Sequence, residues 1–226
     1  MDKSVIKNIG KSFALFLLFF YCWIFRLIPI LLFNIDVENM SAQTNVLLGA
    51  FASICLAIIL FFIYKNDIKE EWKKFRNRFW DNFDVGLSYW LKGLFAMVVF
   101  NFIISNVFKA GGANNEEAVQ GMISALPWMM LITSGVLAPW NEELVFRKSL
   151  KKIFRNKWFY AGVSGLLFGL AHVFSSATVW TDWLYILPYG SLGVAFAASY
   201  YDTDSVFTPI MFHMMHNIIL VLVSIL

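Results

Sequence analysis

Two adjacent carboxylates, Glu142 and Glu143, follow a long apolar segment and precede a cluster of bases. Ionised groups are costly inside a membrane, so acids in this position are candidate functional residues. Glu143 and Arg147 are four residues apart with the acid first, an order that favours an ion pair on one helix face. Glu142 lies about 100° further round the helix and lacks that partner. We therefore predict a supporting role for the pair and a chemical role for Glu142, the alternative being that both acids are interfacial charges.

All three histidines of the chain lie in late apolar segments. A stripe of small residues, which lets another helix approach closely, shares the helix face of His172: Ala161, Gly165 and Gly169. His213 and Asn217 are four residues apart and share a face of the last predicted helix. His216 lies beside this face and is a working residue, a second donor or a packing residue. Polar groups on three helices favour a site over simple helix bridging.

The elements that would position these residues are membrane helices. Of the 226 residues, 59% are hydrophobic and only 15% are charged, against about 25% charged in a soluble domain. We predict an all-α fold, a polytopic transmembrane bundle of about seven helices forming one integral membrane domain over residues 1–226. The predicted spans are 12–33, 46–64, 85–108, 122–146, 158–174, 183–200 and 206–226. Aromatic residues at helical spacing in 65–84 predict an amphipathic helix on the membrane surface.

Charge placement predicts the orientation. Fifteen of the 18 Lys and Arg residues precede the first span or lie in 65–78 and 147–157. By the positive-inside rule, this end and the N-terminus are cytoplasmic. A basic face on a membrane protein favours anionic lipid as a partner and no nucleic acid. At about 1.5 Å per residue, Glu142 would lie about 14 Å deeper in the membrane than Lys151. We therefore expect a water-filled cavity that opens to the cytoplasm.

Three motifs occur in order on separate predicted helices. They are Pro139-x-x-Glu142-Glu143-x-x-Phe146-Arg147, Phe168-x-x-x-His172 and His213-x-x-x-Asn217. This set resembles the CPBP family, the CAAX-protease and bacteriocin-processing group of intramembrane endopeptidases, also called Abi proteins. The resemblance covers residues 122–220, a motif-bearing core, and residues 1–121 fit as packing helices. Ser149 stands where the family often has glycine after the basic pair.

The resemblance implies an enzyme that hydrolyses a peptide bond inside the membrane, on a peptide or small membrane-protein substrate. Glu142 would be the general base that activates water, and His172 would orient that water. His213 and Asn217 would donate hydrogen bonds to the developing oxyanion. The composition is typical of a low-GC bacterium, so we expect a multi-pass protein of the bacterial plasma membrane. Bacteriocin, pheromone or leader peptides are then better candidate substrates than prenylated tails.

Three alternatives remain open from the sequence. The resemblance favours a route without a cofactor, and the alternative is a zinc protease with Glu142, His172 and His213 as ligands. A second alternative is a protein that acts by binding, as a regulator or in bacteriocin self-immunity. A third is a proton-linked transporter with buried acids and histidines as relays, although transporters usually show paired broken helices in two halves. The sequence leaves the oligomeric state open.

Overall fold

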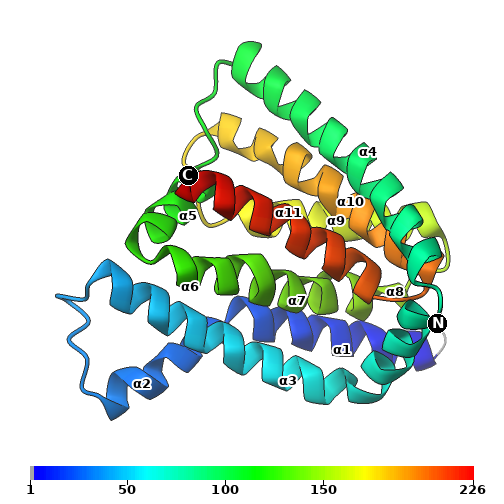
Figure 1. Ribbon diagram of the computed structural model, residues 1–226, viewed down its shortest axis with the longest axis horizontal. Helices are drawn as coiled ribbons and strands as arrows, with labels where there is room; N and C mark the ends of the chain where they lie inside the picture. Colours follow the sequence, from blue (N-terminus) through cyan, green and yellow to red (C-terminus); the bar gives the residue numbers. More distant parts are fainter. Residues whose placement is uncertain (1–2) are drawn as a thin grey trace.

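The computed structural model describes residues 3–226, apart from the side chain of Asn115, and every regular element in this range is helical (Figure 1). The predicted all-α class is thus confirmed. The elements are α1 (Lys3–Phe20), a 3-10 segment (Cys22–Arg26), α2 (Leu27–Leu32), α3 (Ala42–Asn77), α4 (Phe79–Asn106), α5 (Asn114–Ala125), α6 (Pro127–Ile132), a π segment (Thr133–Leu137), α7 (Ala138–Glu142), a second π segment (Glu143–Lys148), α8 (Ser149–Lys151), α9 (Lys157–Val173), a second 3-10 segment (Trp180–Tyr185), α10 (Ile186–Thr203) and α11 (Phe207–Ile225).

The polar stretch after the second predicted span is not a separate surface helix. Helix α3 runs without interruption through 36 residues from Ala42 to Asn77, so the prediction of an amphipathic helix over 65–84 is wrong. The reason is that no glycine or proline follows Gly49 within α3 to break it. At 1.5 Å per residue the helix is roughly 54 Å long, well beyond a hydrocarbon core of about 30 Å. Its polar half therefore extends past the apolar part of the bundle.

The first predicted span is bent. Helix α1 and the helical segment Cys22–Leu32 meet at an angle of 46°. Pro29 lacks an amide hydrogen and cannot donate to the carbonyl of Phe25, which agrees with the 3-10 geometry of Cys22–Arg26 after the bend. The bend turns the 3-10 segment that carries Arg26 toward the start of α3.

The helix that carries both acids begins later than the sequence predicted. Leu126, with φ −154° and ψ 74°, ends α5, and Pro127 begins a new helical run that continues to Lys151. Two π segments interrupt this run, one on each side of α7. Pro139 cannot donate to the carbonyl of Gly135, so the ladder of α-helical hydrogen bonds is broken one turn before the acids.

Several helices are candidates to cross a membrane. Within residues 3–226, α3, α4 and α11 are long and apolar enough, and the bent pair formed by α1 and Cys22–Leu32 would make a fourth. The chain is therefore a membrane protein with several candidate spans. This count does not establish the seven predicted spans, because α9 has only 17 residues, whereas a crossing helix needs about 20.

Glycines bring α9 and α10 into close contact. A Cβ on Gly165 would lie 2.7 Å from the carbonyl oxygen of Gly190, and one on Gly169 would lie 2.6 Å from that of Ile186. No side chain fits at such distances, so the predicted small-residue face is a helix–helix interface. His172 follows on this helix and is held at the same interface.

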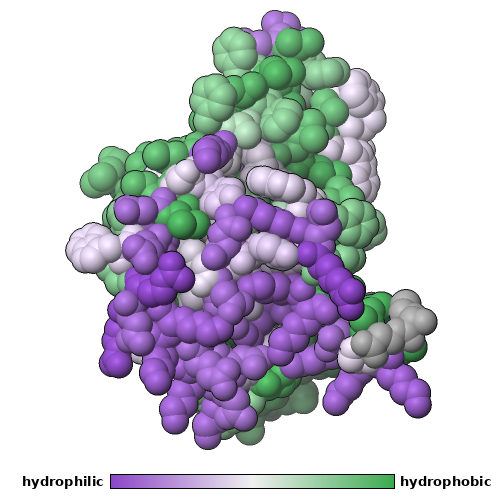
Figure 2. All heavy atoms as spheres, turned by 90° about the vertical axis from the view of Figure 1, so that its right-hand side faces the viewer, coloured by the Kyte–Doolittle hydropathy of each residue, from purple (hydrophilic) through white to green (hydrophobic). Residues whose placement is uncertain are grey.

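The charged segments gather at one end of the bundle. Figure 2 shows this end covered by hydrophilic side chains, whereas much of the surface beyond it is apolar. Ion pairs join segments that are far apart in the sequence: Lys151 to Asp204 at 2.7 Å and Lys157 to Asp202 at 2.6 Å. We call the surface formed by residues 65–78, 147–157 and 201–204 the basic end.

Candidate active site

The two adjacent acids have different surroundings. Glu143 is completely buried, and its Oε2 lies 3.1 Å from Nε of the equally buried Arg147. The predicted ion pair is thus confirmed. Its partner on the other side is His213, whose Nδ1 lies 2.7 Å from Oε1 of Glu143. Glu142 instead lines a cavity and keeps a partly exposed side chain.

Aromatic rings enclose the guanidinium of Arg147. Its central carbon lies 4.3 Å from the ring centre of Phe168 and 5.8 Å from that of Phe196. Within the described residues none of its N–H groups is aligned with an acceptor. The charge is therefore balanced by the Glu143 carboxylate and by the negative faces of the rings.

Side chains of α9 stabilise the π segment Glu143–Lys148. Widening a helix to π geometry displaces carbonyl oxygens from their usual partners. The hydroxyl of Ser164 donates to the carbonyl of Phe146 at 2.7 Å, and that of Tyr160 donates to the carbonyl of Arg147 at 3.1 Å. These bonds give two carbonyl oxygens of the π segment a hydrogen-bond partner and tie the segment to α9. Neither residue was predicted from the sequence, since a hydroxyl in an apolar helix carries no spacing signal.

His213 lies between the two acids. Its Nε2 is 3.6 Å from Oε2 of Glu142, and its ring stacks on Phe196 with centres 4.8 Å apart. A carboxylate only accepts hydrogen bonds, so Nδ1 carries a hydrogen that it donates to Glu143. The buried acid thus sets the orientation and tautomer of the imidazole, and Nε2 faces Glu142.

Asn217 and His172 complete the set of predicted site residues. The Nδ2 of Asn217 donates to the carbonyl of Ser134 at 2.9 Å. His172 Nδ1 lies 2.9 Å from the carbonyl oxygen of Phe168, so this nitrogen is the protonated one. The His172 ring also stacks on Tyr189 with centres 4.6 Å apart.

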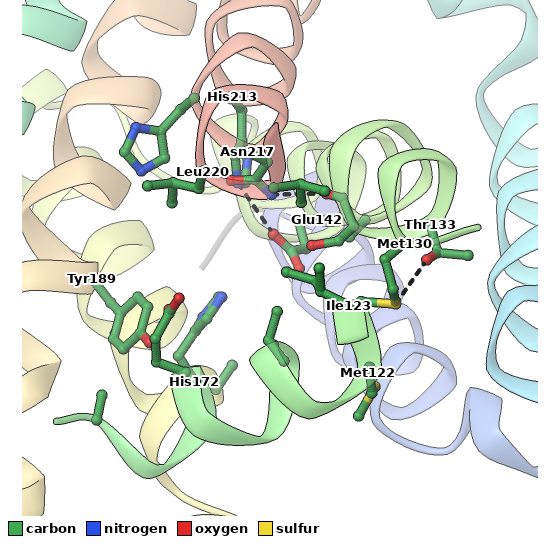
Figure 3. Close-up of a pocket in the computed structure, with 18 of the residues that line it drawn as sticks. Met122, Ile123, Met130, Thr133, Glu142, His172, Tyr189, His213, Asn217 and Leu220 are labelled. Carbon is green, nitrogen blue, oxygen red and sulfur yellow. Dashed lines mark hydrogen bonds and ion pairs between the residues drawn. The ribbon is translucent and has the colours of Figure 1, made fainter. Parts of the chain in front are cut away.

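All four predicted catalytic side chains line one cavity of about 750 Å³. Figure 3 shows Glu142 close to His213 and Asn217, with His172 and Tyr189 across the cavity. Within the described part of the chain no ion pair joins His172 to Glu142, so the two side chains stand on different walls of the cavity. His216 lines the same cavity and packs edge-on against Trp90, with ring centres 6.5 Å apart.

The cavity does not open at the basic end. Its lining extends from Glu142 past Ser53 on α3 to residues at the opposite end of the bundle: Arg26, Asn45, Gly112, Glu116 and Ser224. No residue of the basic end lines it. The expectation of a cavity open on the side of the basic segments is therefore wrong. The reason is that the packed aromatic and aliphatic core around Phe146 and Val206 fills the space between Glu142 and the basic end.

The alternative zinc site does not fit this arrangement. Zinc needs three donor atoms within about 2.0–2.3 Å of one point. Among the described side chains, no group of three His, Cys, Asp or Glu residues lies close enough to hold a metal ion. Glu142 and His213 are neighbours, whereas His172 belongs to the other wall.

Comparison with known proteins decides the family. Residues 124–219 match the family described as type II CAAX prenyl endopeptidase Rce1-like. This part of the chain belongs to that family. The matched residues include Glu142, His172, His213 and Asn217.

A curated relative of the Rce1-like segment is similar over a longer range. It is the "Putative membrane peptidase YdiL" of Bacillus subtilis (strain 168), 31% identical over 135 residues. The aligned region is 58% of this chain and 52% of the relative, so the chain spans about half the length of the curated protein it matches. No solved structure matches the chain.

Proposed function

We propose that this protein is a membrane-embedded endopeptidase that cleaves an apolar, membrane-associated peptide by water attack. The observation that supports this most directly is the pair formed by Glu142 and His213. Their side chains lie 3.6 Å apart on the wall of a cavity large enough for a peptide. Behind them Glu143 and Arg147 are completely buried, which gives the site a rigid frame. Membership of residues 124–219 in a peptidase family agrees with this function.

In the proposed reaction Glu142 takes a proton from a water molecule, and the resulting hydroxide attacks the carbonyl carbon of the scissile bond. His172 holds this water from the opposite wall. The second Nδ2 hydrogen of Asn217 is directed to the oxyanion, since the first is used on the carbonyl of Ser134. His213 donates its Nδ1 hydrogen to Glu143, so it stabilises an oxyanion through Nε2 only when both ring nitrogens are protonated. The proton on Glu142 then passes to the leaving amine.

We also propose seven spans, with the helical run from Pro127 to Lys151, α9 and α10 joining α3, α4, α11 and the bent first helix. The positive-inside rule places the basic end in the cytoplasm. The cavity then reaches Glu142 from the outer side of the membrane. That direction suits a peptide that is secreted or anchored outside, such as a bacteriocin, pheromone or leader peptide, in a bacterial plasma membrane.

Labelling of single cysteines tests the orientation. In a background of Cys22→Ser and Cys55→Ser, a cysteine replacing the exposed Gly112 is expected to react with a membrane-impermeant maleimide in intact cells. A cysteine replacing Asn77 at the basic end is expected to react only after the cells are opened. The reverse pattern would overturn the proposed orientation.

The test of the activity is Glu142→Gln, which keeps the shape of the side chain but removes the base. Loss of a general base typically costs 10²–10⁴-fold in rate, so cleavage by the purified protein in lipid vesicles should fall at least about 100-fold. The assay follows a library of apolar peptides by mass spectrometry. Glu116→Gln is the matched control, because Glu116 lines the same cavity but does not contact His213. Full cleavage by Glu142→Gln would overturn the proposal, and a protein that acts by binding alone would tolerate the change.

A further inference from the structure

Among the described residues 3–226, Arg26 is a cation in an apolar part of the chain with no carboxylate within ion-pair distance. It lies in the 3-10 segment Cys22–Arg26 within the bent first span and lines the same cavity as Glu142. Within residues 3–226 the structure pairs it with no carboxylate, and its guanidinium donates only to Oδ1 of Asn45 on α3. An arginine in an apolar segment normally has a counter-charge or reaches water. Here the remaining N–H groups are left for a ligand in the cavity.

One face of α3 connects Arg26 to the acids. Asn45, Gly49 and Ser53 lie four residues apart, so they follow each other along this face, and all three line the cavity. A Cβ on Gly49 would meet no atom within 4 Å, which shows that the cavity is open above this position. At the far end the carbonyl of Ser53 accepts a hydrogen bond of 3.1 Å from Asn141, the residue before Glu142. A continuous path therefore leads from Arg26 to Glu142.

The length of this path is given by the helix. Asn45 and Ser53 are eight residues apart, which corresponds to about 12 Å along α3 at 1.5 Å per residue. An extended peptide covers about 3.3–3.6 Å per residue. Three to four residues of a peptide would therefore span the distance between the guanidinium and the level of the catalytic carboxylate.

We propose that Arg26 binds a carboxylate of the substrate peptide and thereby determines which peptide bond lies beside Glu142. This inference rests on the proposed peptidase function and adds a specificity site to it. The planar guanidinium forms two parallel hydrogen bonds with a carboxylate, and Asn45 holds its side chain in place from below. The bond that is cut lies three to four residues from the bound carboxylate, which is either the C-terminal group or an acidic side chain.

The position of Arg26 favours a peptide over a lipid headgroup. The side chain faces the interior cavity that contains Glu142, His213 and Asn217. A lipid phosphate would be bound from the outer surface of the bundle instead. Glu116 lines the same cavity but is not in ion-pair contact with Arg26, and its carboxylate accepts a hydrogen bond from Gln120 at 3.2 Å.

The test compares two apolar decapeptides that differ only in the last group, a free carboxylate or a carboxamide. The measured quantity is the ratio of their kcat/KM values, for protein in phosphatidylcholine vesicles. We expect the wild-type protein to prefer the carboxylate peptide about tenfold or more, through KM. Arg26→Gln should bring the ratio close to one, and Arg26→Lys should keep part of the preference. Arg78→Gln is the control. Arg78 is an exposed arginine at the junction of α3 and α4, so this substitution removes the same charge outside the cavity.

A second peptide series measures the spacing. A single Glu is moved along an amidated apolar peptide, and mass spectrometry locates the cut. The expected cut stays three to four residues from the Glu as it moves. A cut at a fixed place, or a wild-type ratio near one, would overturn the inference while leaving the peptidase function intact.

Binding separates failure of the inference from failure of the proposed function. Fluorescence anisotropy with labelled peptides on Glu142→Gln protein reports the preference even where no cleavage occurs. If the wild type cleaves none of the peptides but Glu142→Gln protein binds the carboxylate form more tightly, only the peptidase function fails. If phosphatidylglycerol vesicles abolish the preference, Arg26 holds lipid phosphate, and the assignment to a peptide carboxylate is overturned.

Discussion

The imidazole of His213 lies 2.7 Å from the carboxylate of Glu143, and this contact joins α11 to the π segment after α7. Glu143 therefore does more than pair with Arg147 on its own helix. It orients the imidazole that faces Glu142, so Glu143 and Glu142 contact the same histidine from two sides. The site is held together by a charge that has no contact with solvent.

Replacing Glu143 should weaken the whole fold. Glu143→Gln leaves Arg147 as a completely buried cation without a counter-charge, and breaking such a pair costs about 3–5 kcal/mol. We expect a lower thermal midpoint of the detergent-solubilised protein, followed by circular dichroism. The double variant Glu143→Gln with Arg147→Met should recover part of the loss, because no uncompensated charge remains. If the double variant loses as much stability as the two single variants together, this explanation is contradicted.

A bulky side chain at Gly49 should block the cavity without damaging α3. Leucine has a higher helix propensity than glycine by roughly 0.5–1 kcal/mol, and a Cβ at this position meets no atom within 4 Å. Gly49→Leu is therefore expected to fold as well as the wild type and to cleave peptides at least about tenfold more slowly. Gly121→Leu is the matched control, since position 121 is equally open but does not line the cavity. Equal losses in both variants would show that the effect is not blockage.

Glu71 connects three parts of the bundle at the basic end. Its carboxylate accepts hydrogen bonds from Lys148, from the hydroxyl of Tyr200 at 3.0 Å and from the amide of Val206 at 2.8 Å. Glu71→Ala removes the acceptor of the buried Lys148 ammonium group and of two other buried donors. We therefore expect the free energy of unfolding to fall by roughly 3 kcal/mol or more. The neighbouring Glu70 is exposed, and Glu70→Ala should change the unfolding free energy by less than about 0.5 kcal/mol.

Asp204 should make stability depend on pH in the acidic range. Burial alone would raise the pKa of its carboxyl group, but the ammonium groups of Lys151 and Lys74 more than offset this and hold the pKa below its usual value. A pKa that is lower in the folded protein means stability that is present above the unfolded value, about 3.9, and lost as the pH falls through the folded value. Thermal unfolding between pH 3 and 6 measures this loss.

The control for Asp204 keeps its backbone unchanged. The residue has a left-handed conformation, with φ 50°, which asparagine also tolerates. Asp204→Asn should therefore lower the thermal midpoint at pH 6 and flatten its dependence on pH. A variant in which the exposed Asp84 is replaced by Asn should retain the full dependence. A wild-type slope in Asp204→Asn would show that other carboxyl groups are responsible.

The sequence alone determined the features that depend on spacing along one helix. The period of 3.6 residues is enough to predict the Glu143–Arg147 pair, the small-residue face of α9, and the shared face of His213 and Asn217. The order of the three motifs also predicted the family of the second half of the chain. Local rules suffice for these features because the residues of each set lie on one helix, within about three turns of each other.

Only the tertiary structure decided how these faces meet. The rotation of α11 about its axis brings His213 to Glu143, and the packing of the surrounding helices places Glu142 on the wall of the cavity. The direction in which the cavity opens, and the place of Arg26 on its wall, depend on which helices fill the space around the site. Contacts between helices depend on axial shifts and rotations of a few ångströms, and no spacing along the chain encodes these.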